Sequence, residues 1–284
     1  MSAPKKLVIY HKSCMDGFSA AWVAKKKFGD KAQFFPAVHQ TPFPKDVKGK
    51  EVYMIDFCYP ENIMEKIKKE AARVIVIDHH ISQKEAVKIS DERLFDIKHS
   101  GAVLAWKYFY PGKKVPKLLL YVEDTDIWKF TMPKSKELFA SLETVKFDFK
   151  AWSRLASEFE TSEGRKKYLE KGKAILDFIG RSIDNIVANA EPVRFEGHKA
   201  YVVNSPLLIS DVGHVLAEKA GGVGIVWVKK GNKLKISLRS NGRVDVSKIA
   251  LKYGGGGHKA AASFSVSLEK GMVKFPWKAT SVDK

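Results

Sequence analysis

One acid and two imidazoles follow directly after a run of four branched apolar residues. Residues 74–77 (VIVI) predict a buried strand, because a strand covered on both faces need not alternate. Asp78, His79 and His80 come next, where a parallel sheet opens at its carboxyl edge and holds ligands. This stretch indicates a metal site, and taken alone it is equally consistent with a hydrogen-bonded polar turn.

Further acidic and imidazole groups follow other apolar segments of the first half. They are His11 and Asp16, then Asp56, then Asp124 and Asp126. Because the carboxyl ends of parallel strands lie on one edge of a sheet, we expect these groups to converge. Each has a plainer explanation by itself. Asp16 and Asp56 could cap the helices that follow them, and Asp126 could be a surface acid.

Several carboxylates brought together repel one another, and divalent cations remove that penalty. Carboxylate oxygen combined with imidazole nitrogen suits Mn²⁺, Zn²⁺ or Fe²⁺ better than Ca²⁺. Such a set can hold two ions about 3.5–4 Å apart, the spacing used in metal-assisted phosphate ester hydrolysis.

The elements that must position these groups alternate between strand and helix. Strands are predicted at 7–11, 51–56 and 73–77, and helices at 16–28, 61–71, 100–109 and 117–121. This alternation predicts an α/β fold with a mainly parallel sheet flanked by helices. Helical spacing dominates the later part of 149–189. Strands at 200–203, 223–228, 234–238 and near 261–266, with a helix at 211–220, indicate a smaller α/β unit. We therefore expect a catalytic domain at 1–160, a connecting helix at 161–190 and a C-terminal domain at 191–284.

Four successive glycines form a second motif, followed by His258 and Lys259. Such a run is too flexible for the interior of a helix or strand. Its amide N–H groups can cradle an anion. Upstream, Arg239 and Ser240 end a strand, where the guanidinium could grip phosphate in a bidentate way. The alternative is a flexible surface hairpin.

The formal net charge of +18 favours a polyanionic partner. The alternative is that the basic surface only keeps the protein soluble. Two cysteines without metal-finger spacing fit a reducing compartment. Residues 1–6 lack the apolar core of a signal peptide, and no apolar run approaches the length of a membrane span. We expect a cytoplasmic protein without a membrane partner.

The chain resembles the DHH phosphoesterase family, in the branch with a DHH-associated C-terminal domain. Residues 78–80 are similar to the motif that names the family, and Asp56 and Asp124 to its second and fourth motifs. Residues 239–240, 244–247 and 254–258 are similar to the substrate-binding signature of the associated domain. The departure lies in the first motif, where Cys14 replaces the first acid of Asp-x-Asp, and His11 is one position from its place in some members. A thiolate there would favour zinc or iron, and the alternative is a small buried residue beside the site.

The resemblance implies a two-metal hydrolase. We expect it to act from an end on short single-stranded oligonucleotides or related nucleotides. Its cofactors would be two divalent cations, Mn²⁺ first, with Zn²⁺, Fe²⁺ and Mg²⁺ open. The expected metal ligands are His11, Cys14, Asp16, Asp56, Asp78, His79 and Asp124. The expected catalytic residues are Asp78, His79 and His80. The expected substrate-binding residues are Arg239, Ser240, Gly254, Gly255, Gly256, Gly257 and His258.

Two other functions compete with this one: an exopolyphosphatase or inorganic phosphohydrolase, and a non-catalytic nucleic-acid-binding protein that lost an acid at Cys14. The sequence does not distinguish a monomer from a homodimer.

Overall fold

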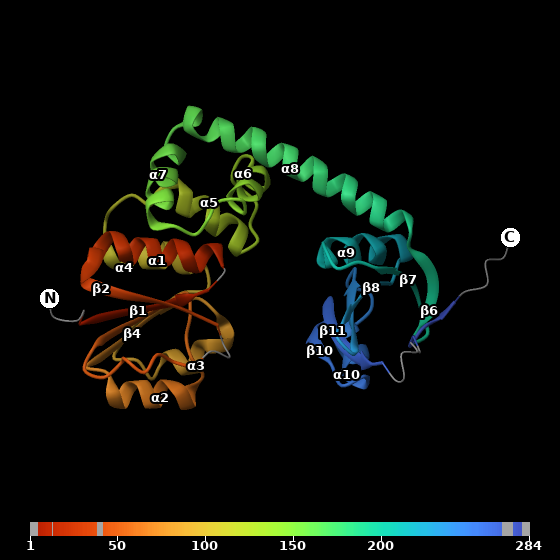
Figure 1. Ribbon diagram of the computed structural model, residues 1–284, viewed down its shortest axis with the longest axis horizontal. Coiled ribbons are helices and arrows are strands. Elements are labelled where there is room, and N and C mark those ends of the chain that lie inside the picture. The colour runs from red at the N-terminus through yellow and green to blue at the C-terminus, as the bar shows by residue number, and fades with distance from the viewer. Residues whose placement is uncertain (1–4, 13, 39–41, 269–274, 280–284) are drawn as a thin grey trace. The chain divides into compact units, whose positions relative to one another are not determined.

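The structure is a computed structural model that describes residues 5–12, 14–38, 42–268 and 275–279. The chain divides into two compact units, Met1–Leu176 and Asp177–Lys284. Figure 1 shows the helices and strands of each unit. The division of the chain at residues 160 and 190 that the sequence suggests stays a prediction.

The N-terminal unit is built on a five-stranded sheet in the order β2-β1-β3-β4-β5, in which every neighbouring pair is parallel. The strands are β1 (Lys6–His11), β2 (Ala32–Ala37), β3 (Glu51–Ile55), β4 (Arg73–Asp78) and β5 (Glu92–Phe95). In register, Tyr10 lies opposite Ile55, and Ile55 lies opposite Ile77. The carboxyl ends of the three central strands therefore meet, which confirms the predicted parallel sheet.

Helices cover both faces of this sheet (Figure 1). On one face lie α1 (Met15–Phe28) and α4 (Gly101–Phe109), and on the other α2 (Glu61–Glu70) and α3 (Lys84–Val87). Beyond α1 and α4 come α5 (Lys117–Asp126), α6 (Ser135–Leu142) and α7 (Phe149–Phe159). Single 3₁₀ turns occupy Gly29–Lys31 and Ile81–Gln83.

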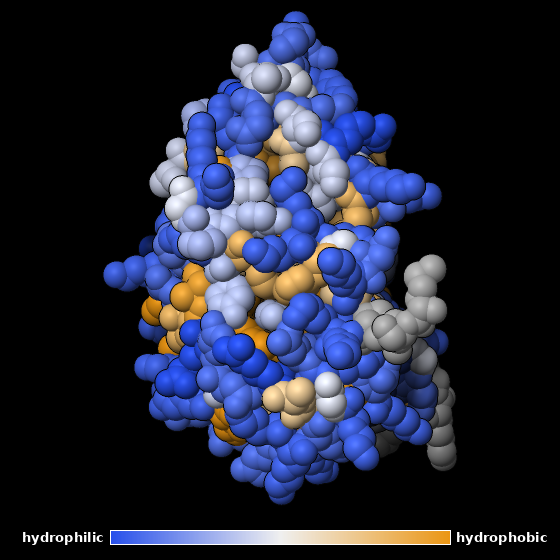
Figure 2. Space-filling view, turned by 90° about the vertical axis from the view of Figure 1, so that its left-hand side faces the viewer, coloured by the Kyte–Doolittle hydropathy of each residue, from blue (hydrophilic) through white to orange (hydrophobic). Residues whose placement is uncertain are grey.

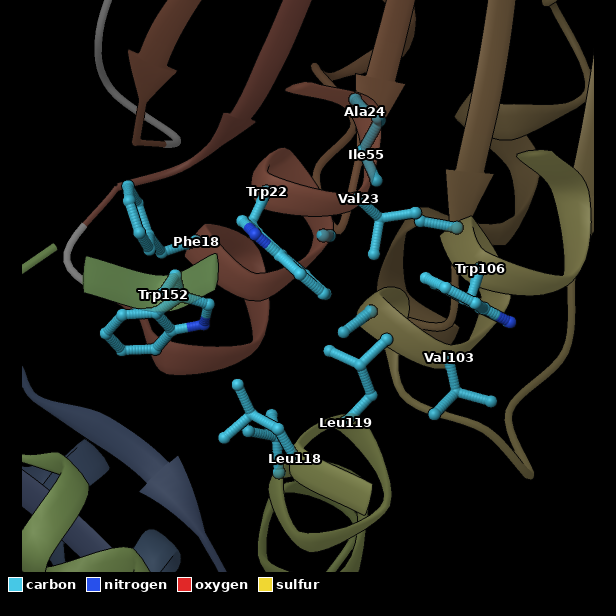
Figure 3. Packing of buried hydrophobic residues seen from close by; sticks show 14 of the residues in the cluster. Phe18, Trp22, Val23, Ala24, Ile55, Val103, Trp106, Leu118, Leu119 and Trp152 are labelled. Atoms are coloured by element: carbon cyan, nitrogen blue, oxygen red, sulfur yellow. The ribbon is translucent and has the colours of Figure 1, made fainter. Parts of the chain in front are cut away.

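A separate hydrophobic core fills each side of the sheet. On the side of α1, the rings of Trp22 and Trp106 stack with centroids 6.4 Å apart, close to Leu119 (Figure 3). On the side of α2, Met64 and Ile67 pack among buried side chains. Burial on both sides explains why β4 is continuously apolar. The face drawn in Figure 2 is covered largely by hydrophilic residues, with hydrophobic residues in patches between them.

The second unit begins within α8 (Ser162–Ala188), a helix of 27 residues. Its seven-stranded sheet has the order β10-β11-β9-β8-β7-β6-β12, and only the β7–β8 pair is parallel. The strands are β6 (Glu191–Phe195), β7 (His198–Asn204), β8 (Val223–Lys230), β9 (Lys233–Ser240), β10 (Gly256–His258), β11 (Ala261–Ser267) and β12 (Lys278–Ala279). The helices α9 (Ile209–Ala220) and α10 (Val246–Lys252) lie on this sheet (Figure 1). A smaller C-terminal α/β unit was expected and is confirmed. Within the described ranges, no helix is both long and apolar enough to cross a membrane.

Candidate metal centre

Asp56 lies at the centre of the site, directly after β3. Its backbone is left-handed, with φ of 54°, a conformation that Asp tolerates better than most residues. Its buried carboxylate faces three imidazoles. Oδ1 lies 3.1 Å from His79 Nε2 and 3.9 Å from His80 Nδ1, and Oδ2 lies 3.6 Å from His11 Nδ1. The ends of β1, β3 and β4 are therefore brought together as the sequence predicted.

Two glycines allow helices α1 and α4 to approach Asp56 closely. A Cβ atom at Gly17 would lie 2.4 Å from the carbonyl oxygen of His11 and 3.1 Å from Asp56 Oδ2. A Cβ atom at Gly101 would lie 2.5 Å from Asp56 Cβ. Sequence reasoning missed both, because a single glycine at the start of a helix signals nothing until the neighbouring strand is placed.

Asp16 faces the same point from α1. The helix begins at Met15 with Cys14 as its N-cap residue, so Asp16 does not cap it. Its carboxylate accepts hydrogen bonds from the N–H groups of Gly101 (2.6 Å) and Ala102 (3.0 Å), in the first turn of α4. A helix N-terminus favours negative charge there. Asp16 Oδ2 lies 3.7 Å from His79 Nε2.

The predicted ligand Asp124 does not reach the cluster, and Asp126 takes that position. Asp126 Oδ2 lies 3.5 Å from His79 Nε2. Asp124 instead accepts hydrogen bonds from Thr131 N and Oγ1 at 2.8 Å and from Met132 N at 3.1 Å. Helix α5 continues to Asp126, and side chains two positions apart in a helix point about 200° apart around its axis. The structure thus places Asp126 at the cluster, while the ligand role of Asp124 stays a prediction. The sequence did not show that the helix extends this far.

Asp78 is fully buried at the end of β4. Its Oδ1 accepts hydrogen bonds from the backbone N–H groups of His79 (2.7 Å) and His80 (3.3 Å), and it lies 2.7 Å from His80 Nδ1. Its Oδ2 has no hydrogen-bond partner within the described part of the chain. Asp78 thus fixes the turn and the ring orientation of His80.

Cys14 lies beside the cluster. Its sulfur, a ring nitrogen of His11 and a carboxylate oxygen of Asp56 all lie within 4.8 Å of one another. Burial, together with the negative charge of Asp56, raises the pKa of the Cys14 thiol to about 12. Cys58 is buried in the core on the side of α2, where its thiol donates to the Tyr59 carbonyl at 3.4 Å.

The carboxylates carry an excess of negative charge in a confined space. Burial, then the charges of Asp56 and Asp126, raise the pKa of Asp16 well above its ordinary value. Burial and Asp56 raise the pKa of Asp126 to about 6. Burial alone would raise the pKa of Asp56, but the nearby imidazoles of His11 and His79 lower it to about 2. The hydrogen bond to Asp78 raises the pKa of His80 to about 9.

The donor set fits divalent cations. Asp56 and Asp78 each have a buried carboxylate oxygen without a hydrogen-bond partner among the described residues. Three groups of side chains each bring one ligand atom per residue within 4.8 Å: Asp16, His79 and Asp126; His11, Cys14 and Asp56; and Asp56, Asp78, His79 and His80. Oxygen and nitrogen ligands suit Mn²⁺, Zn²⁺ or Fe²⁺, and a cation would relieve the repulsion that raises the pKa of Asp16 and Asp126.

In the second unit, Arg239 and Ser240 make hydrogen bonds within their own fold. The Arg239 guanidinium donates to Ser210 Oγ at 2.8 Å and to the Leu238 carbonyl at 2.9 Å. Two of its five N–H groups are thereby used. The buried Ser240 hydroxyl accepts from the N–H groups of Gly242 and Val244, so it holds the turn after β9.

The four glycines end one helix and begin one strand. The N–H groups of Gly254 and Gly255 donate to carbonyls in the last turn of α10. The expectation that this run avoids strands is wrong for Gly256 and Gly257, which lie with His258 in β10. A Cβ atom at Gly257 would lie 2.5 Å from the Ala261 carbonyl oxygen, so close pairing with β11 requires a glycine there. His258 is exposed.

A family model described as the DHHA1 domain matches residues 208–275, within the second unit. A parallel sheet with acids and histidines at its strand ends, followed by this domain, is the arrangement that the resemblance to DHH phosphoesterases implies. The chain belongs to the DHH phosphoesterase family.

Particular proteins are similar to this chain in sequence or in fold. The chain is 32% identical over 297 residues to uncharacterized protein R106 of Acanthamoeba polyphaga mimivirus, covering 95% of this chain and 69% of that protein. A pGpG-specific phosphodiesterase, PggH from Vibrio cholerae, has a similar fold, with a TM-score of 0.52, 16% identity and coverage of 92% and 93%. The DHH domain of a member of the s1p family of ribosomal proteins gives a TM-score of 0.53 at 13% identity, with coverage of 93% and 82%.

Proposed function

We propose that this chain hydrolyses phosphodiester bonds at an end of short oligonucleotides or related nucleotides, with two divalent cations. The observation that carries the proposal is the convergence of Asp16, Asp56 and Asp126 on one imidazole. Their carboxylate oxygens lie 3.7, 3.1 and 3.5 Å from His79 Nε2.

Asp16, His79 and Asp126 would hold one cation, and His11 and Cys14 the other. Asp56 would contact both, because its two oxygens face His79 and His11 separately. When bound, the cations supply Lewis-acid stabilisation of the charge that develops on the phosphate. Mn²⁺ is the cation that we propose first. The Cys14 thiol, where it binds as thiolate, shifts the preference toward Zn²⁺ or Fe²⁺.

His80 would orient the phosphate or the attacking water. Its Nδ1 lies 2.7 Å from Asp78 Oδ1, which leaves Nε2 to make one hydrogen bond to the substrate. Asp78 is a positioning residue in this scheme, because its carboxylate contacts backbone N–H groups and the ring of His80.

The second unit would supply a phosphate-binding group within its own fold. Arg239 keeps N–H groups that are not used by Ser210 or Leu238, and a guanidinium suits phosphate. Residues 254–258 would lie against the same ligand. The net charge of +18 supports an anionic substrate. The similar Vibrio enzyme is specific for pGpG, which supports a short substrate here.

The test is hydrolysis of a 5′-labelled RNA dinucleotide with Mn²⁺ by the wild-type chain, Asp56→Asn and Asp184→Asn. Asp184 is exposed on α8, so its variant is the matched charge control. We expect mononucleotide release by the wild type and the control, and its loss in Asp56→Asn. Phosphate release from polyphosphate alone would favour an exopolyphosphatase. Binding without turnover under every metal would favour a non-catalytic protein.

A further inference from the structure

The segment that follows Asp126 carries the most exposed large hydrophobic side chain of the described residues. We call residues 127–132 the aromatic loop. Trp128 is 80% exposed, two residues after Asp126. Two residues of chain span at most about 7 Å, so the indole is attached next to the metal centre. Exposure of one aromatic residue is common and does not by itself indicate a binding site. The backbone conformation of the aromatic loop and the contacts that hold it do point to one.

The backbone of the aromatic loop is held in an unfavourable conformation. Trp128 has φ of 59° and Phe130 has φ of 49°, both left-handed. Bulky residues rarely adopt this region, because Cβ approaches the carbonyl oxygen. Such conformations persist where the surrounding structure enforces them, and they cluster at ligand-binding sites.

Asp124 enforces this conformation. Its backbone carbonyl accepts hydrogen bonds from the N–H groups of Lys129 (2.9 Å) and Phe130 (3.1 Å). Its carboxylate accepts from Thr131 and Met132. The loop is thus fixed by hydrogen bonds to one residue of α5, while the indole remains outside the core.

Phe130 supports the indole from within the loop. The two rings meet edge to face, with centroids 4.9 Å apart and planes at 78°. Lys136 Nζ lies 5.2 Å from the centroid of Phe130 on a different element. Trp128 is therefore presented in a defined orientation with most of its surface free.

We propose that Trp128 is a stacking platform for a nucleobase of the substrate whose phosphate lies at the metal centre. This inference rests on the proposed function and names its substrate class: phosphoesters that carry a base, in contrast to polyphosphate. Stacking on an aromatic ring accepts every base, because each has a π face. Trp128 would raise affinity for nucleotides without selecting a sequence.

The test compares the binding of AMP and ribose 5-phosphate with Mn²⁺ present, by isothermal titration calorimetry. The two ligands share a phosphate and a sugar and differ only in the base. The proteins are the wild type, Trp128→Ala, Trp128→Phe and Phe178→Ala. Phe178 is 66% exposed on α8, so its variant controls for loss of an exposed aromatic residue.

We expect the wild type to bind AMP at least fivefold more tightly than ribose 5-phosphate, which is about 1 kcal/mol. Trp128→Ala should lose this preference through weaker AMP binding, with the affinity for ribose 5-phosphate unchanged. Trp128→Phe and Phe178→Ala should keep most of it.

Equal affinities of the wild type for both ligands would overturn the inference. A preference for AMP that persists in Trp128→Ala would also overturn it. So would a loss of affinity that is equal for AMP and ribose 5-phosphate in both Trp128→Ala and Trp128→Phe. Dinucleotide turnover is measured on the same samples. If the wild type fails to cleave, the proposed function fails, while the binding comparison still decides the role of Trp128.

Discussion

Two carboxylates of α5, two positions apart, perform different tasks. Asp126 faces His79, and Asp124 is hydrogen-bonded to Thr131 and Met132. Both are acidic residues at the end of one apolar helix, so composition does not separate them. Which of the two faces the metal centre depends on where the helix ends and on the turn that follows. Both are set by backbone hydrogen bonds.

This difference predicts opposite responses to Mn²⁺. Asp126→Asn should lose the rise in melting temperature that Mn²⁺ gives the wild type, because a cation that binds the native state stabilises it. Asp124→Asn should keep that rise but start from a lower melting temperature. Loss of hydrogen bonds to a buried carboxylate costs about 1–3 kcal/mol. A thermal-shift series with EDTA and with Mn²⁺ measures both. An Asp124→Asn chain that no longer responds to Mn²⁺ would identify Asp124 as a ligand.

The metal-free site also predicts a pH-dependent stability. Burial and the charge of Asp56 raise the pKa of Asp126 from 3.8 to about 6. The folded chain therefore holds this proton more tightly than the unfolded chain. Its free energy of unfolding falls as pH rises from about 4 to 6, and the full penalty is present above pH 6. At 1.36 kcal/mol per pKa unit, this is at most about 3 kcal/mol.

Asp126→Asn removes that penalty. In EDTA at pH 8 it should unfold at a higher urea concentration than the wild type, and the difference should vanish below about pH 4. Asp184→Asn, an exposed change of equal charge, should show no such pH-dependent gain. If Asp126→Asn is no more stable than the wild type at pH 8, the repulsion that we describe is absent.

At the scale of elements, the strands that hold the site were predictable and the edge strands were not. The central strands β1, β3 and β4 are continuously apolar because both faces are covered. The edge strand β5 has the sequence ERLF, and β2 contains Pro36. Edge strands need no continuous apolar run, so their sequences resemble loops.

The close approach of α4 to Asp56 could not be predicted from sequence, since it depends on Gly101. Gly101→Ala should weaken Mn²⁺ binding by about tenfold or more, because the new Cβ atom would lie 2.5 Å from Asp56 Cβ and displace that carboxylate. Gly180→Ala in α8 is the matched control, because a Cβ atom there meets nothing within 4 Å. It should leave Mn²⁺ binding unchanged and stabilise the helix by about 0.5–1 kcal/mol. Calorimetric titration with Mn²⁺ compares the two, and equal affinities would show that Asp56 tolerates the displacement.

At the scale of the whole molecule, the net charge of +18 predicts a salt-dependent affinity. Each phosphate contacted on a single strand contributes about −0.7 to the slope of log affinity against log salt. Three contacts would lower affinity for a pentanucleotide about 10- to 20-fold between 50 and 200 mM NaCl. Fluorescence anisotropy with Ca²⁺ in place of Mn²⁺ measures this, with a dinucleotide as the shorter control. A slope near zero for both lengths would mean that the basic surface serves solubility alone.

Helix α5 carries the acid that faces the metal centre and, two residues earlier, the residue that fixes the aromatic loop. A substitution that shifts the end of this helix displaces both by similar amounts. Under the two proposals made above, the chemical step and the binding of the base therefore both depend on the end of this one helix. A descendant that changed its preferred ligand while remaining active would have to vary the exposed tip at Trp128 and keep Asp124 and Asp126 in place. Natural variation should accordingly concentrate at the tip.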